Sequence, residues 1–221
     1  MLFKPNDIVI FFGDSITDCD RVKPAGEGTA TSRSLGYGYV SLLQGCLEAR
    51  HPELKLRVIN KGTSGDRTRE LLKRIDQDVI SYKPNWVVLF IGINDVWRGF
   101  EMPNNRFEYT SNDDYKSNLD AIVHRIKSQG AQIILCSPYM IEPNKQDVMR
   151  SRMDEFGAIC KETSEKYQLY YVDMQLAFDN ILKDKTPYEL AGDRIHPNGV
   201  GHSLIMLALA NIIENGLPKS E

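Results

Sequence analysis

Residues 8–17 read Ile8-Val9-Ile10-Phe11-Phe12-Gly13-Asp14-Ser15-Ile16-Thr17, a short apolar run that ends in a Gly-Asp-Ser turn. The run has the length and the β-branched and aromatic content of a buried strand. Amphipathic segments with helical periodicity, such as 71–80 and 119–126, separate it from four more runs of this kind at 56–60, 86–91, 132–137 and 170–173. Strands that alternate with helices predict an α/β fold, a three-layer α/β/α sandwich with a five-stranded parallel sheet.

The composition is that of a single globular domain. The chain has 221 residues, of which 42% are hydrophobic and 26% are charged, with 16 Gly and 10 Pro. These values exclude a disordered, collagen-like or coiled-coil protein. No linker or repeat divides the sequence, and an apolar helix predicted at 201–214 closes it. We therefore predict one domain over residues 1–221.

Charge and cysteine content limit the expected partners and compartment. The formal net charge is only -3, and no basic block is longer than Lys73-Arg74, so neither nucleic acid nor a membrane is expected as a partner. The four cysteines lie far apart without a Cys-x-x-Cys pair, which indicates reduced thiols. Residues 1–7 lack the features of a secretory signal. We expect a cytoplasmic protein, unless a presequence precedes these residues.

Two long connections, 13–37 and 93–112, leave the carboxyl ends of predicted strands, where open α/β sheets bind ligands. Connections of this length in a compact domain are usually functional or disordered. The second is predicted to be a loop, and it carries bulky and basic side chains, namely Trp97, Arg98, Phe100, Met102 and Phe107.

Ser15 lies on the tight turn beyond the first predicted strand. The simpler explanation for an isolated Gly-Asp-Ser is a turn or helix-capping serine. Thr17 stands where the Gly-x-Ser-x-Gly nucleophile elbow requires Gly, which disfavours an ordinary α/β-hydrolase. Asp193 and His196, three residues apart in a loop, could supply a base and its orienting carboxylate, although each alone is explained as a capping or loop residue. His202, in the last predicted helix, is expected to be structural.

An acyl-transfer site also needs donors aimed at the developing oxyanion. Gly62 and Asn94 follow the second and third predicted strands, and each taken singly is explained as a turn residue. Together with Ser15 and the pair Asp193 and His196, they supply every part of such a site from separate segments of the chain.

In combination these residues resemble the four blocks of the SGNH (GDSL) hydrolase family, namely Gly13-Asp14-Ser15, Gly62, Gly92-x-Asn94-Asp95 and Asp193-x-x-His196. Longer stretches, such as 91–98 and 139–142, are similar to intracellular bacterial acetylxylan esterases within it. The resemblance implies a flavodoxin-like sheet and a serine esterase that needs neither metal nor cofactor. It implies that Ser15 attacks the ester carbonyl, His196 takes its proton and Asp193 orients His196. The oxyanion would lie among the N–H groups of Ser15 and Gly62 and the side-chain amide of Asn94.

The candidates for contact with substrate are Asp14, Trp97, Arg98 and Tyr139. Trp97 could form a stacking wall for a sugar ring, or could simply pack against the domain or a neighbouring subunit. The predicted substrate loops contain no long apolar run, which favours a short acyl group such as acetyl. A solvated acidic turn explains Asp14, Asp18 and Asp20 better than a cation site does.

The leading hypothesis is a serine esterase that hydrolyses short-chain acyl esters, above all O-acetyl groups of xylo-oligosaccharides or other carbohydrates. A lysophospholipase or an acyl thioesterase is the alternative within the same chemistry. A receiver-like binding module, with Asp14 and Asp95 in an acidic pocket, is the alternative from another class, but it leaves Ser15 and Asn94 unexplained. The resemblance also implies a homo-oligomer.

Overall fold

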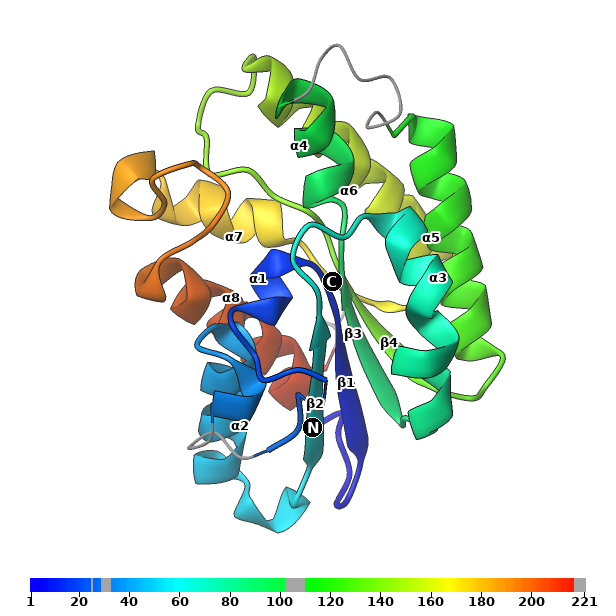
Figure 1. Cartoon of the computed structure of the whole chain (residues 1–221). Coiled ribbons are helices and arrows are strands. Elements are labelled where there is room, and N and C mark those ends of the chain that lie inside the picture. Colours follow the sequence, from blue (N-terminus) through cyan, green and yellow to red (C-terminus); the bar gives the residue numbers. More distant parts are fainter. Residues whose placement is uncertain (25, 29–32, 102–109, 217–221) are drawn as a thin grey trace.

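The computed structural model describes residues 1–24, 26–28, 33–101 and 110–216, and these residues form a five-stranded parallel sheet between helices (Figure 1). The strands lie in the order β2-β1-β3-β4-β5. Their bounds are β1 Ile8–Gly13, β2 Arg57–Gly62, β3 Trp86–Phe90, β4 Gln132–Cys136 and β5 Tyr170–Val172. This is the flavodoxin-like order of a doubly wound sheet, so the predicted fold class is confirmed.

The helices lie in two layers that cover the two faces of the sheet (Figure 1). On one face α2 packs against α8, and α8 packs against α7. On the other face α3 packs against α5, and α5 packs against α6. The helix bounds are α1 Ser15–Asp18, α2 Tyr39–Arg50, α3 Thr68–Asp78, α4 Ile93–Glu101, α5 Asn112–Lys127, α6 Val148–Tyr167, α7 Met174–Ile181 and α8 Gly199–Asn215. Short 3-10 turns occupy Arg33–Leu35, Pro52–Leu54, Ile80–Tyr82 and Pro187–Glu189.

The central strands are apolar because helices cover them on both sides. All five residues of β3 are buried, as is β1 from Val9 onwards. The strand β2, at one edge of the sheet, begins with the exposed Arg57 and is buried from Val58 onwards. Burial on both faces also explains why these strands read as continuous apolar runs rather than as alternating ones.

Helix α4 differs from the prediction, which treated 93–112 as a loop. Its first residues bury Ile93 and Val96, three positions apart, while Trp97 packs against the edge of the core. That spacing is helical, but it spans too few residues to stand out in the sequence. Residues 102–109, including Met102 and Phe107, lie outside the described residues.

The strand register brings the candidate site together. Gly13, at the end of β1, pairs with Gly62 of β2 on one side and with Phe90 of β3 on the other. The segments that follow these three strands therefore leave the sheet at the same level and at the same edge.

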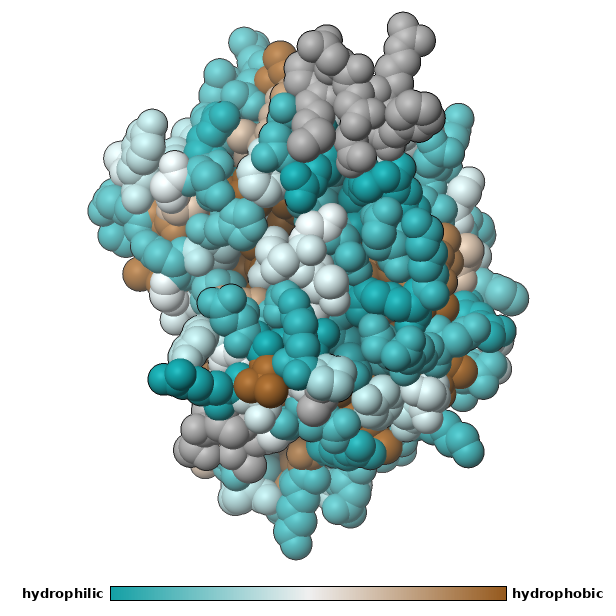
Figure 2. All heavy atoms as spheres, viewed as in Figure 1, coloured by the Kyte–Doolittle hydropathy of each residue, from teal (hydrophilic) through white to brown (hydrophobic). Residues whose placement is uncertain are grey.

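Figure 2 shows hydrophilic side chains over most of the face viewed, with only scattered hydrophobic ones. In the described ranges, no helix is both long enough and apolar enough to span a bilayer.

Candidate active site

The turn from β1 into α1 presents Ser15 at the carboxyl edge of the sheet. A Cβ atom on Gly13 would lie 2.4 Å from the carbonyl oxygen of Phe90, so only glycine allows this close approach. The Asp14 carboxylate caps α1 by accepting the N–H of Ile16 at 3.0 Å. Ser15 is consequently the first residue of the helix.

The imidazole of His196 connects Ser15 to Asp193. Its Nε2 lies 2.9 Å from the Ser15 Oγ, and its Nδ1 lies 2.6 Å from the Asp193 Oδ2. The other Asp193 oxygen accepts the N–H groups of Ile195 and His196, at 3.0 and 2.8 Å. Partial burial raises the pKa of Asp193, but the hydrogen bonds from His196 and from these N–H groups outweigh it, so the pKa lies below its usual value. Asp193 is therefore a carboxylate at neutral pH.

The side chain of Tyr139 supports residues 193–197, here called the histidine loop, from the interior of the domain. Its hydroxyl donates to the carbonyl oxygen of Ile195 at 3.0 Å, and its ring stacks on Phe178 with centroids 4.1 Å apart. Tyr139 is fully buried, so its predicted contact with substrate is wrong. It supports the residue that precedes His196 instead.

Two donors face the same region as the Ser15 hydroxyl. The side-chain amide of Asn94 donates one hydrogen to the Asp66 carbonyl oxygen at 3.0 Å, which leaves its second hydrogen for a ligand. The backbone N–H of Ser15 has no acceptor among the described residues. Ser15 and Asn94 both line one pocket, as the sequence predicts.

Gly62 does not reach this pocket, and its predicted place in the oxyanion hole is wrong. Its N–H donates to the Asn60 Oδ1 at 2.8 Å, and a Cβ atom there would lie 2.1 Å from the Asp18 nitrogen, inside the packing of α1 on β2. Gly65 lines the pocket instead, with φ of +85°, and its N–H has no acceptor in the part of the chain that the structure describes. The sequence signal was a second glycine in the same turn, in Ser64-Gly65-Asp66.

The pocket above Ser15 has a volume of about 550 Å³. Its lining residues come from α1 and the two residues after it, the turn after β2, α4, the histidine loop and α8. They are Ser15, Ile16, Cys19, Asp20, Ser64, Gly65, Asn94, Trp97, Arg98, Glu101, His196, Pro197 and His202. Trp97 meets His196 edge to face, with ring centroids 5.5 Å apart. The Arg98 guanidinium lies 5.7 Å from the Trp97 ring centroid and pairs with Glu101. These two predicted substrate residues therefore do face the site.

His202 lies in the wall of this pocket, beside His196. Its Nδ1 accepts the N–H of Tyr39 at 3.2 Å, so the predicted structural role is consistent with the contacts. Burial, together with the nearby His196, lowers the pKa of His202 to about 4. The imidazole of His202 therefore stays neutral near pH 7.

The acidic residues near Ser15 do not form the solvated turn expected from the sequence. Asp14 and Asp18 are buried, and only Asp20 is exposed. Burial raises the pKa of Asp14 to about 7, and one of its oxygens has no partner among the described residues. Because Asp14 is 1% exposed and absent from the pocket lining, its predicted contact with substrate is also wrong. No cluster of three or more metal-ligating side chains occurs in the described ranges.

Asp95 is equally buried and serves the fold. It accepts the Thr68 N–H at 3.0 Å and the Thr68 Oγ1 at 2.7 Å, at the start of α3. Desolvation by burial raises the pKa of Asp95 to about 6 despite these bonds. With neither Asp14 nor Asp95 open to solvent, the receiver-like alternative loses its acidic pocket.

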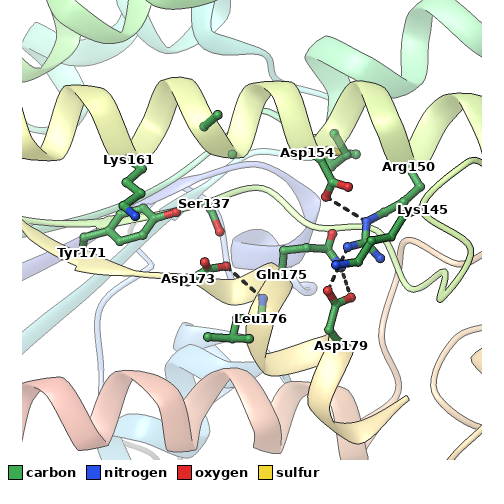
Figure 3. A pocket seen from close by; sticks show the side chains of 13 residues that line it. Ser137, Lys145, Arg150, Asp154, Lys161, Tyr171, Asp173, Gln175, Leu176 and Asp179 are labelled. Atoms are coloured by element: carbon green, nitrogen blue, oxygen red, sulfur yellow. Dashed lines mark hydrogen bonds and ion pairs between the residues drawn. The ribbon is translucent and has the colours of Figure 1, made fainter. Parts of the chain in front are cut away.

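A second pocket, of about 310 Å³, lies between α6 and α7 (Figure 3). Its central cation is the buried Arg150, which donates to Asp154 at 2.8 Å and to Asp179 at 2.9 Å. Asp173 caps α7 through the N–H of Leu176, as the dashed lines in Figure 3 show. Much of the charge in this pocket is thus used in holding α6 and α7 together, whereas the pocket above Ser15 carries a nucleophile, a base and free donors.

Comparisons with known proteins agree with this geometry. The model of the GDSL-like lipase/acylhydrolase family matches residues 11–204. The chain is 44% identical over 200 residues to an acetylxylan esterase from Geobacillus stearothermophilus, a match that covers 90% of each sequence. It also superposes on Axe2, an acetylxylan esterase from the same organism, in a structure of a catalytic mutant whose serine is replaced by alanine. The TM-score is 0.94, the identity is 41%, and 100% of both chains is covered. Two further catalytic mutants of Axe2 replace an aspartate and a histidine three positions apart, and both give a TM-score of 0.94. LAE5, an alpha/beta hydrolase enzyme from the metagenome of Lake Arreo in Spain, matches with a TM-score of 0.94 and 41% identity over 97% of this chain and 98% of that one.

Proposed function

The chain belongs to the GDSL-like lipase/acylhydrolase family, and we propose that it is a serine esterase that removes O-acetyl groups from xylo-oligosaccharides or other carbohydrates. The observation that carries this proposal is the chain of hydrogen bonds from the Ser15 Oγ through His196 to Asp193. Ser15 and His196 line the same pocket as Asn94. The catalytic mutants of Axe2 support it, because there too the aspartate and histidine are three positions apart, as Asp193 and His196 are here.

Acylation begins when the Ser15 Oγ attacks the ester carbonyl carbon and its proton passes to the His196 Nε2. The carboxylate of Asp193 stabilises the imidazolium through the Nδ1–H. The carbonyl oxygen becomes an oxyanion, which accepts from the N–H groups of Ser15 and Gly65 and from the Asn94 amide. His196 then protonates the departing sugar oxygen as its bond to the acyl carbon breaks, leaving an acyl group on Ser15.

Deacylation repeats these steps with water. The neutral His196 removes a proton from a water molecule, which attacks the acyl carbon of the ester on Ser15. The same donors stabilise the second oxyanion, and His196 returns the proton to the Ser15 Oγ as the carboxylic acid leaves. Every proton moved and every bond made or broken in the cycle thus belongs to Ser15, His196, the substrate or water.

The pocket supports a short acyl group and a polar alcohol. Most of its lining residues are polar or charged, and its apolar ones include Ile16, Trp97 and Pro197. His196 must lie beside the leaving oxygen in order to protonate it, and Trp97 contacts His196. Trp97 therefore stands on the side where the sugar would leave, and we assign the sugar contact to its ring, with Arg98 beside it.

The other expectations from the sequence stay predictions. They are a single domain over residues 1–221, a cytoplasmic location, assembly into a homo-oligomer, and activity without a metal or cofactor.

A panel of ester substrates tests the proposed function. We expect rapid release of acetate from acetylated xylo-oligosaccharides and from p-nitrophenyl acetate, with long-chain p-nitrophenyl esters nearly inert. Acyl thioesters and lysophospholipid represent the alternative activities, and Ser15→Ala is the control for background hydrolysis. A preference for long acyl chains, or for lysophospholipid, would contradict the proposal. Stoichiometric labelling of Ser15 by a fluorophosphonate, lost in Ser15→Ala, is the independent check on the nucleophile.

A further inference from the structure

Asp18 is a buried carboxylate that the reaction steps leave without a role. It is the last residue of α1, three positions after Ser15, and only 3% of its surface is exposed. Its Oδ2 accepts the Ser64 N–H at 3.1 Å, the Ser64 hydroxyl at 3.0 Å and the Lys23 ammonium at 2.7 Å. Its Oδ1 is buried without a partner among the described residues. Such a carboxylate is costly to bury, because it loses its hydration and one of its oxygens gains no hydrogen bond in return.

The partner of Asp18 lies next to an oxyanion donor. Ser64 directly precedes Gly65, and both residues line the pocket above Ser15. The bond to the Ser64 N–H fixes the Thr63–Ser64 peptide, and the bond to the hydroxyl fixes the Ser64 side chain, one residue before Gly65. They therefore influence where the Gly65 N–H points relative to the nucleophile.

Hydrogen bonds also hold Asp66, the residue after Gly65 in the same turn. Asp66 accepts the Asn94 amide on its carbonyl oxygen at 3.0 Å, and its Oδ2 accepts the Arg74 Nε at 2.7 Å. A continuous path of covalent and hydrogen bonds thus runs from Ser15 through Asp18, Ser64 and Gly65 to Asn94. It joins the three groups that would bind the oxyanion.

The backbone of α1 is anchored separately, so the carboxylate is not needed to keep the helix in place. The Asn60 Nδ2 donates to the Thr17 carbonyl oxygen at 2.6 Å and to the Leu35 carbonyl oxygen at 2.8 Å. Gly62 allows α1 to pack directly on the end of β2. The Asp18 side chain adds a link from this anchored helix to the turn that carries Gly65.

We propose that Asp18 is a positioning residue that sets the Gly65 N–H against Ser15 and so completes the oxyanion hole. This inference rests on the proposed esterase function. Its contribution should appear in the transition state rather than in substrate binding, because an oxyanion forms only after attack. The single oxygen that accepts from Ser64 is the essential feature, and the negative charge is secondary.

The test compares Asp18→Ala with Asp18→Asn on p-nitrophenyl acetate. We expect Asp18→Ala to lower kcat at least about tenfold and to change KM by less than about twofold. Asp18→Asn keeps an oxygen for Ser64, and we expect it to restore most of the lost rate. Lys23→Ala is the matched control, because it removes the half-exposed ammonium and leaves both Ser64 bonds in place.

Three results would overturn the inference: an unchanged kcat in Asp18→Ala, a loss confined to KM, or an equal loss in Asp18→Asn. If Asp18→Ala does not fold, Ser64→Ala decides, since it removes the hydroxyl bond alone. We expect Ser64→Ala to lower kcat by about twofold to fivefold with its melting temperature unchanged, and an unchanged kcat would reject the role of Asp18. An inactive wild-type enzyme would reject the esterase function itself, so the two failures are distinguishable.

Discussion

The side-chain amide of Asn94 is tied by one hydrogen to the Asp66 carbonyl oxygen, 3.0 Å away, in the turn that also holds Gly65. A side-chain donor and a backbone donor are thereby fixed to each other before any substrate arrives. Donors that are already oriented need no rearrangement when negative charge develops, which is why they stabilise a transition state so effectively.

Asn94→Ala should lower kcat for p-nitrophenyl acetate by about 100-fold, equivalent to about 3 kcal/mol of transition-state stabilisation. Asn118→Ala is the matched control, because it removes a part-buried amide that donates to Thr68 rather than into the pocket. We expect its activity to stay near that of the wild type. Similar rates for Asn94→Ala and the wild type would remove Asn94 from the oxyanion hole.

Gly65→Ala should lose activity as well as stability. The residue has φ of +85°, and an added Cβ would come within 3.2 Å of the Arg98 guanidinium. Gly130→Ala is the control, since Gly130 has φ of +84° with nothing within 4 Å of its Cβ position. In urea unfolding, both variants should lose about 1 kcal/mol of unfolding free energy, because alanine is strained in a left-handed backbone conformation. Only Gly65→Ala should also lower kcat, because the added methyl group lies in the pocket beside Arg98, and equal activity in the two variants would show that the pocket tolerates it.

His202 should make the protein less stable in mild acid. Its pKa of about 4 in the folded chain lies below the ordinary value of 6.5, so between these pH values the unfolded state binds more protons. The free energy of unfolding should therefore fall as the pH drops from 6.5 to 4, by about 3 kcal/mol at most from this group. His202→Asn keeps an acceptor for Tyr39 without titrating.

Urea unfolding of the wild type and His202→Asn at several pH values measures this effect. The difference between the two plots of unfolding free energy against pH isolates the contribution of His202. Asp14 and Asp95 contribute to both plots, and their raised pKa values increase the unfolding free energy as the pH drops. A difference that does not change with pH would mean that His202 titrates normally.

Arg150→Ala should destabilise the fold and spare the activity. Arg150 is 1% exposed, and its guanidinium pairs with Asp154 on α6 and Asp179 on α7, so its loss leaves two partly buried carboxylates without a cation. We expect a loss of about 3 kcal/mol in unfolding free energy. Arg125→Ala, which breaks an exposed pair with Asp76, should cost less than about 1 kcal/mol. A strong fall in kcat for folded Arg150→Ala would instead link the second pocket to catalysis.

Trp97→Ala should separate sugar recognition from chemistry. We expect KM for acetylated xylo-oligosaccharides to rise about tenfold, because a ring that contacts a sugar contributes mainly to binding. The kinetics with p-nitrophenyl acetate should change much less, since its leaving group is not a sugar. Equal effects on both substrates would show that Trp97 acts through His196 instead.

The sheet, and the edge of it at which the candidate site lies, could be predicted from sequence for a simple physical reason. Strands covered on both faces must be apolar throughout, and the residues that follow them meet at one edge. Ser15, Asn94 and His196 each have a simpler explanation when taken singly, so the candidate site is predicted from their combination in separate segments of the chain.

The sequence does not decide which of several similar residues faces the pocket. Gly62 and Gly65 are both compatible with the turn after β2, and only the packing of α1 on Gly62 separates them. Tyr139 and Asp14 look like polar substrate contacts in sequence, but the structure places both under the site. Helix α4 was missed because its buried positions span barely more than one turn.

The bond from the Tyr139 hydroxyl to the Ile195 carbonyl oxygen spans 56 positions of the sequence. The Asp193-x-x-His196 segment therefore owes the placement of its imidazole partly to a tyrosine that follows β4. The segment is therefore not sufficient by itself for transplanting the site into another protein. Grafting it onto another sheet would transfer a base and its carboxylate, but a tyrosine placed like Tyr139 would have to be introduced as well.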